Sequence, residues 1–178
     1  MQNKNSGIMA DYSPIREDAS RIIISYGLTK LSKDLYEWME IYLYKKQCNS
    51  LRLVDVKEAI LNDINAKTDE KILSGFVWTP EGGDPINVWL SSENQRNFSE
   101  AQRMAAANDA ILPLTFKLGE TADGAPVYHT FETVAELNSF YLAAFAFINQ
   151  CLIEGWQQKD AIDWTPYEEL FTPEQEQE

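Results

Sequence analysis

The sequence predicts an α+β protein with two β-hairpins, a helix in mid-chain, a long C-terminal helix, and an N-terminal arm and hairpin. Hydrophobic residues make up 44% and aromatic residues 12% of the 178 positions, which is enough apolar material for a packed core. Segments that alternate apolar and polar residues predict strands, whereas apolar residues three and four positions apart predict helices. Both patterns occur along the chain, and we find no internal repeat.

The first 52 residues are predicted to form an arm followed by an aromatic-rich hairpin. Residues 1–20 are rich in Asn, Ser and charge without a sustained period, so they are interpreted as an extended arm that could dock on a partner. Segments 21–26 and 35–44 are predicted to pair within residues 21–52. An amphipathic helix over 33–46 is the alternative, and the aromatic density favours the strand. On that strand two sets of side chains would point to opposite sides: Tyr36, Trp38, Tyr42 and Tyr44 against Leu35, Met39, Ile41 and Leu43.

Residues 53–164 are predicted to form an α+β domain. Apolar residues at helical spacing predict a helix over 53–66, which a turn at 68–70 would end. Two short strand patterns, 72–78 and 86–90, flank a loop rich in Pro and Gly and therefore predict a hairpin. Ser92 with Gln95 forms a capping-box pattern that opens a helix through about residue 108.

A second hairpin and the longest helix complete this domain. Residues 112–118 alternate strictly, and Asp123-Gly124 supplies a turn before the partner strand at 127–131. Thr133 with Glu136 forms another capping box, and a wide apolar stripe follows at helical spacing over 134–152. Gly155 either ends this helix or only interrupts it. Residues 165–178 are predicted to be an acidic, frayed tail.

The charge of the chain bears on its partners. The formal net charge is -13, from 28 acidic and 15 basic residues, so phosphate backbones and anionic lipid would be repelled. We therefore expect neither nucleic acid nor a membrane as partner, and basic protein surfaces or divalent cations would suit better. The two cysteines, Cys48 and Cys151, are expected to be free thiols in a reducing compartment.

No catalytic, cofactor-binding or metal site is predicted. His129 is the sole histidine, and strand alternation predicts that it is a structural side chain, either packed or partly exposed. Cys151 falls in the apolar stripe of the long helix, where a thiol has a raised pKa and low reactivity. A segment beginning at Asp63 has some features of a calcium loop, but Thr68 stands where Gly is needed and Ser74 where a bidentate Glu is needed.

The aromatic set of segment 35–44 is the candidate interface. Tyr36, Trp38, Tyr42 and Tyr44 would form a contact surface on one strand face, where aromatic residues act as binding hot spots. Packing of the same side chains beneath a helix is one alternative. A platform for carbohydrate is another.

Two short motifs resemble a family found in bacteriophages. The stretch EKILSGFVW (70–78), followed by VWLSSENQ (88–95), resembles a domain of unknown function in tailed-bacteriophage and prophage proteins. The order of the remaining elements is also similar, and the resemblance spans 56–164. It implies a virion structural protein, associated with a tail or head fibre, that works by contact with other virion proteins and assembles as a small symmetric oligomer rather than acting as an enzyme.

The resemblance leaves rival functions open. The protein would be located in the virion after synthesis in the bacterial cytoplasm, and an acidic rim around the aromatic surface would steer it to its partner. A fibre-assembly chaperone that does not enter the virion is one alternative. An accessory that binds host glycans is the other.

Overall fold

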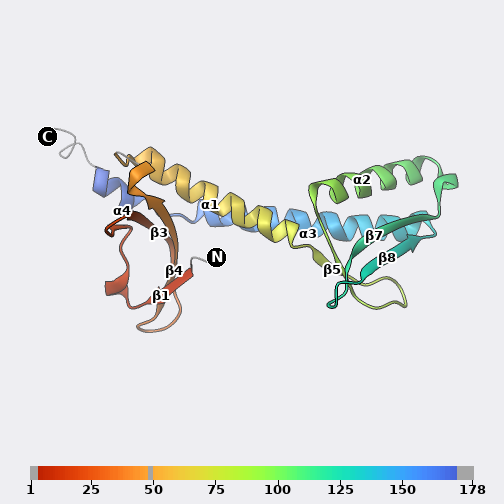
Figure 1. The fold of residues 1–178 in the computed structure, drawn as a ribbon, viewed down its shortest axis with the longest axis horizontal. Coiled ribbons are helices and arrows are strands. Elements are labelled where there is room, and N and C mark those ends of the chain that lie inside the picture. The colour runs from red at the N-terminus through yellow and green to blue at the C-terminus, as the bar shows by residue number, and fades with distance from the viewer. Residues whose placement is uncertain (1–3, 48–49, 172–178) are drawn as a thin grey trace. The chain divides into compact units, whose positions relative to one another are not determined.

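The structure is a computed structural model that describes residues 4–47 and 50–171, and the predicted α+β class is confirmed. The chain divides into two compact units. We call Met1–Ala66 with Gly155–Glu178 the sheet unit, and Lys67–Glu154 the hairpin unit (Figure 1). The predicted ranges 21–52 and 53–164 differ from this division, because the first part of the helix that starts at Leu53 supplies core residues to the sheet.

The sheet unit contains a four-stranded antiparallel sheet in the order β1-β4-β3-β2. Its strands are β1 (Lys4–Gly7), β2 (Ile15–Glu17), β3 (Arg21–Lys30) and β4 (Tyr36–Tyr44). The predicted hairpin of β3 and β4 is confirmed, and the helical alternative over 33–46 is wrong. A bulge interrupts the β3–β4 register at Gly27, whose φ of 67° suits a residue without a Cβ atom.

The predicted arm at 1–20 is wrong for its described part. β1 and β2 pair along β4 and β3, and a short 3₁₀ helix, Met9–Asp11, lies between them. Both strands are short edge strands that join the sheet through backbone hydrogen bonds and bury little apolar surface. Their sequences therefore lack the pattern of alternating apolar residues from which a strand is predicted.

One face of the sheet packs on helix α1 (Leu53–Leu73). Its core contains Ile24 and Tyr26 of β3, together with Val56, Ile60 and Ile64 of α1. The predicted helix at 53–66 is confirmed, but the turn at 68–70 is wrong because the helix continues. Extending an existing helix costs far less than starting one, so three polar residues do not end it.

The C-terminal segment also belongs to this core. Helix α4 (Thr165–Glu168) and a 3₁₀ turn, Glu169–Phe171, stand where a frayed tail was predicted, so that prediction is wrong as far as residue 171. Tyr167 is 2% exposed, and its hydroxyl donates a hydrogen bond of 2.5 Å to the Ser25 carbonyl. The acidic run at 174–178 lies outside the described residues.

Besides the C-terminal end of α1, the hairpin unit contains the two predicted hairpins and two further α-helices. They are β5 (Phe76–Trp78) with β6 (Ile86–Val88), β7 (Leu114–Glu120) with β8 (Pro126–Phe131), α2 (Ser92–Ala107), and α3 (Val134–Asp160), which continues into the sheet unit's residues. The backbone N–H of Trp89 donates to the Leu118 carbonyl at 2.8 Å and so links the hairpins. Ser91, rather than the predicted Ser92, caps α2, and α3 continues through Gly155.

The core of the hairpin unit is aromatic. Phe140 of α3 is fully buried and contacts rings from three other elements, in Trp78, Phe98 and Phe131. Such edge-to-face and tilted contacts add stabilisation beyond the burial of apolar area. The core therefore holds both hairpins and α2 against α3 within this unit.

Candidate functional site

The aromatic set of β4 lies on the face opposite the helix-packed core, as predicted from strand alternation. Met39, Ile41 and Leu43 pack toward α1, and the even-numbered residues point the other way. The four aromatic side chains differ in exposure, however. Trp38 is 3% exposed, whereas Tyr42 is 38% and Tyr44 is 60% exposed.

Tyr36 and Trp38 are covered by neighbouring side chains. The ammonium group of Lys30 lies 5.8 Å from the centre of the half-buried Tyr36 ring. Trp38 makes an edge contact with Tyr12 at a centroid distance of 5.8 Å. Trp38 thus supports the face from beneath, and Tyr42 and Tyr44 are the aromatic side chains that a partner can reach.

A buried carboxylate lies between the aromatic side chains. Glu40 is 1% exposed and accepts hydrogen bonds from Arg16 Nη2 (2.7 Å), Trp38 Nε1 (2.9 Å) and the Tyr42 hydroxyl (2.7 Å). Burial raises the pKa of Glu40, but hydrogen bonds from Trp38, Tyr42, Asn5 and Arg16 outweigh this effect and lower the pKa to about 2. Glu40 is therefore a fixed negative charge that holds Tyr42 in place.

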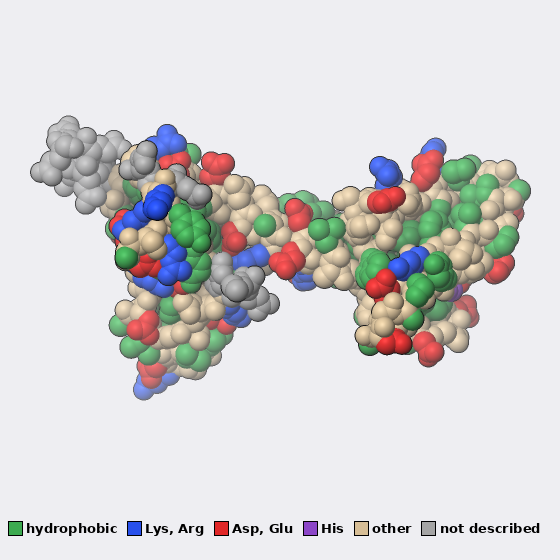
Figure 2. Space-filling model, in the orientation of Figure 1, with side chains coloured by type: hydrophobic (Ala, Val, Ile, Leu, Met, Phe, Trp, Pro, Cys, Tyr) green, Lys and Arg blue, Asp and Glu red, His purple; other side chains and the backbone are tan. Residues whose placement is uncertain are grey.

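Two arginines flank the exposed tyrosines. Arg21 lies opposite Tyr44 in the β3–β4 register, and its guanidinium is 5.0 Å from the centre of the Tyr42 ring. Arg16 reaches the same face from β2 through its bond to Glu40. We call Arg16, Arg21, Tyr42 and Tyr44 the tyrosine face. Figure 2 shows Lys and Arg side chains next to hydrophobic ones over the region of β3 and β4.

The prediction of an acidic rim is therefore wrong, because arginine side chains border the exposed tyrosine rings. Asp18 does reach this region, where it pairs with Arg21 at 2.6 Å. The distribution of charge along the chain agrees with this. Residues 1–54 contain eight Lys and Arg against six Asp and Glu, and residues 55–178 contain seven against 22. The net charge of -13 thus comes from the second range, and the tyrosine face lies in a segment of slightly positive charge.

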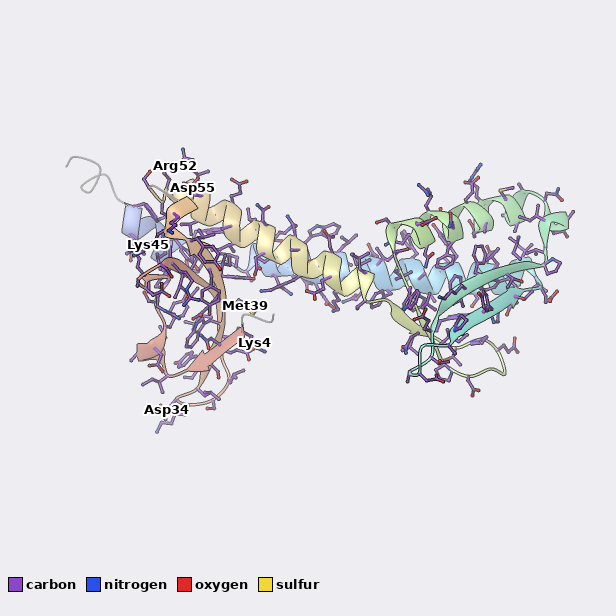
Figure 3. All side chains as sticks on the ribbon, viewed as in Figure 1. Lys4, Asp34, Met39, Lys45, Arg52 and Asp55 are labelled. Atoms are coloured by element: carbon purple, nitrogen blue, oxygen red, sulfur yellow. The ribbon has the colours of Figure 1, made fainter. Side chains whose placement is uncertain are left out.

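A cavity of about 710 Å³ opens elsewhere in the sheet unit. Its lining includes the rings of Tyr12, Tyr26, Trp38 and Tyr167. Lys4 and Met39, which pair across β1 and β4, also line it and are labelled in Figure 3. No short-range pattern brings these rings together, because Tyr167 joins the sheet from the other end of the chain.

The other residues singled out from the sequence have structural surroundings. His129 Nε2 is 2.8 Å from a carboxylate oxygen of Glu136, and its ring packs edge-on against Trp78 and Phe131. Cys151 is 2% exposed in the core of the hairpin unit, and burial raises its pKa. The predictions of a structural histidine and a buried thiol are confirmed, and Cys48 lies outside the described residues.

The described residues contain neither a metal-type cluster nor a membrane-spanning type of helix. Across 4–47 and 50–171, no three His, Cys, Asp or Glu side chains gather as they would around a metal ion. In the same part of the chain, no helix combines the length and apolar character that crossing a bilayer requires.

Most of the chain matches a known protein family. Residues 55–175 match a family described as a domain of unknown function (DUF4376). No curated protein and no solved structure matches the chain. The tyrosine face lies before the matched range, in residues 16–44.

Proposed function

We propose that this chain, which belongs to the DUF4376 family, is a structural protein of a bacteriophage virion that works by protein–protein contact at a tail or head fibre. The resemblance of EKILSGFVW and VWLSSENQ to phage proteins supports the phage setting. Two lengths of chain would then have separate roles. Residues 55–175 match the family, and the sheet that precedes them would carry the contact surface.

The main support for the proposal is that an exposed tyrosine is held in place by the buried Glu40 and the stacked Arg21. Tyr and Arg are enriched at the centres of protein interfaces, where a few residues supply most of the binding energy. Tyr42 is already oriented by its bond to Glu40 and by the stacked Arg21, so less conformational entropy is lost on binding. A surface prepared in this way is suited to contact rather than to catalysis.

The partner of this face is an acidic or carbonyl-rich protein surface. A guanidinium group has five N–H donors, and Glu40 and Asp18 use only some of those of Arg16 and Arg21. The unused donors can reach acceptors on a partner while the tyrosine rings bury apolar area against it.

Mass spectrometry of purified virions tests the proposal. The protein should be present at a fixed copy number, and the double substitution Tyr42→Ala with Tyr44→Ala should remove it from the particles. Tyr128→Ala is the matched control, because Tyr128 is 63% exposed in the hairpin unit and its loss should leave incorporation unchanged.

Three outcomes would overturn parts of the proposal. Absence of the protein from particles whose fibres fail to fold without it would identify an assembly chaperone. Binding to host polysaccharide that is lost with Tyr42 and Tyr44 would identify a glycan-binding accessory. Incorporation of the double variant at the normal copy number would show that another surface makes the contact.

A further inference from the structure

Helix α3 exposes a line of residues with the spacing of a coiled-coil seam. Leu142, Phe145, Asn149 and Leu152 are separated by three, four and three residues, as successive a and d positions are. Leu142 is 63% exposed, Phe145 is 56% exposed, Asn149 is exposed and Leu152 is half-buried. The line covers about 15 Å of helix, and its two exposed apolar residues, Leu142 and Phe145, are left largely uncovered by their own unit.

Most of this line lies away from the helix face that forms the core, and Leu152 at its end packs partly against that core. Phe140, Ala144 and Cys151 point inward and are buried in the hairpin unit. Ala146, next to Phe145, is small and exposed, so it would let another helix approach closely. The same helix thus has one face for its own core and a second face of coiled-coil type.

The charge pattern indicates what covers the second face. Seventeen consecutive residues, 137–153, carry no charge, although the hairpin unit contains five Lys and Arg against twelve Asp and Glu. Two copies of such an acidic unit repel each other over most of their surfaces. An uncharged helix face is the place where they can meet without bringing like charges together.

Asn149 supports a second copy as the occupant. In the described part of the chain its side chain has no hydrogen-bond partner. An Asn at an a position lowers the stability of a coiled coil but fixes its register and oligomeric state, because its amide pairs with the same residue of the neighbouring helix. If a different protein covered this face with an apolar surface, the Asn149 amide would be buried without a hydrogen-bond partner, and this would reduce the free energy of binding.

We propose that Leu142, Phe145, Asn149 and Leu152 form a self-association seam, on which α3 of a second copy packs with the two Asn149 side chains opposite each other. The seam deepens the proposed function by supplying its oligomer, but it does not depend on the tyrosine face. Virion incorporation and self-association are measured separately, so either can fail alone.

Sedimentation velocity of the full chain over a concentration series tests the seam. The wild type should associate reversibly, and Leu142→Glu with Phe145→Glu should weaken association by about thirtyfold or more, the size of a hot-spot loss. Met104→Glu is the control for an added carboxylate, since Met104 is 46% exposed on α2 of the same unit and the substitution adds one of the two negative charges of the double variant. It should leave association unchanged.

Asn149→Leu provides a second variant, which should strengthen self-association instead of disrupting it. Leucine at this position should tighten association by about tenfold and broaden the range of oligomers, because the polar constraint is removed. A wild type that stays monomeric at every concentration would overturn the proposal. Equal weakening by Met104→Glu, or an Asn149→Leu variant that associates no more tightly, would overturn it as well.

Discussion

Replacing Glu40 by Gln should destabilise the sheet unit in a way that depends on pH. Glutamine keeps the volume of the side chain but removes the charge that Arg16, Trp38 and Tyr42 stabilise. The pKa of Glu40 is about 2 in the folded chain against an ordinary value of 4.5. Each pKa unit is worth about 1.4 kcal/mol, so ionised Glu40 contributes about 3 kcal/mol to the free energy of unfolding.

The sign of the pH dependence follows from the lowered pKa. The contribution of Glu40 is fully present above pH 4.5 and is lost as the pH falls from there through about 2, where the wild-type side chain becomes protonated. The difference in free energy of unfolding between wild type and Glu40→Gln should therefore be about 3 kcal/mol at pH 7 and should shrink toward zero in acid.

Urea unfolding at a series of pH values measures this difference. Glu37→Gln on the same strand is the control, because Glu37 pairs with Lys4 at the surface and such pairs contribute about 0–1 kcal/mol. Equal stability of Glu40→Gln and wild type at neutral pH would refute the account of Glu40 as a stabilising buried charge. So would a difference that does not change between pH 7 and 3.

Three further predictions concern the hairpin unit. Gly75→Ala should destabilise this unit by at least about 3 kcal/mol in urea unfolding, because φ is +82° and the new Cβ would lie 2.0 Å from a backbone oxygen of β6. Gly124→Ala is the control, because φ is +84° there as well but the space around the new Cβ is open. It should cost about 1–2 kcal/mol. Phe140→Ala should cost about 3–5 kcal/mol in the same assay, since the ring is fully buried. In a Cys48→Ser background, Cys151 should react with Ellman's reagent only after denaturant is added, and reaction of the folded chain would contradict its burial.

The elements that could be predicted from the sequence are those whose side chains alternate or repeat within one segment. The β3–β4 hairpin, both hairpins of the second unit and α3 all bury a regular set of apolar residues, and periodicity detects such sets. β1 and β2 could not be found in this way, because they are four and three residues long and depend on backbone pairing with strands elsewhere. Tyr167 joins the core through a contact 142 residues away in sequence.

The candidate site was predicted in part for the same reason. Alternation placed Tyr36, Trp38, Tyr42 and Tyr44 on one face, but it could not rank their exposure, which depends on Tyr12 and the edge strands. Glu40 was missed as well. A carboxylate in the middle of an aromatic strand face is itself a signal of a buried, hydrogen-bonded charge, because such a group is seldom kept in an apolar setting without donors.

Contacts through the tyrosine face and through the α3 seam should respond to salt in opposite directions, so their salt dependence tells them apart. Contacts of Arg16 and Arg21 with an acidic partner are attractive, so screening weakens them as ionic strength rises. Association through the α3 seam brings together two copies that each carry a net charge of -13, so screening removes repulsion and should tighten it. Self-association that weakens in salt would instead indicate that the tyrosine face of one copy binds the acidic residues of another. In that case substitution of Tyr42 should weaken self-association, whereas substitution of Phe145 should leave it unchanged.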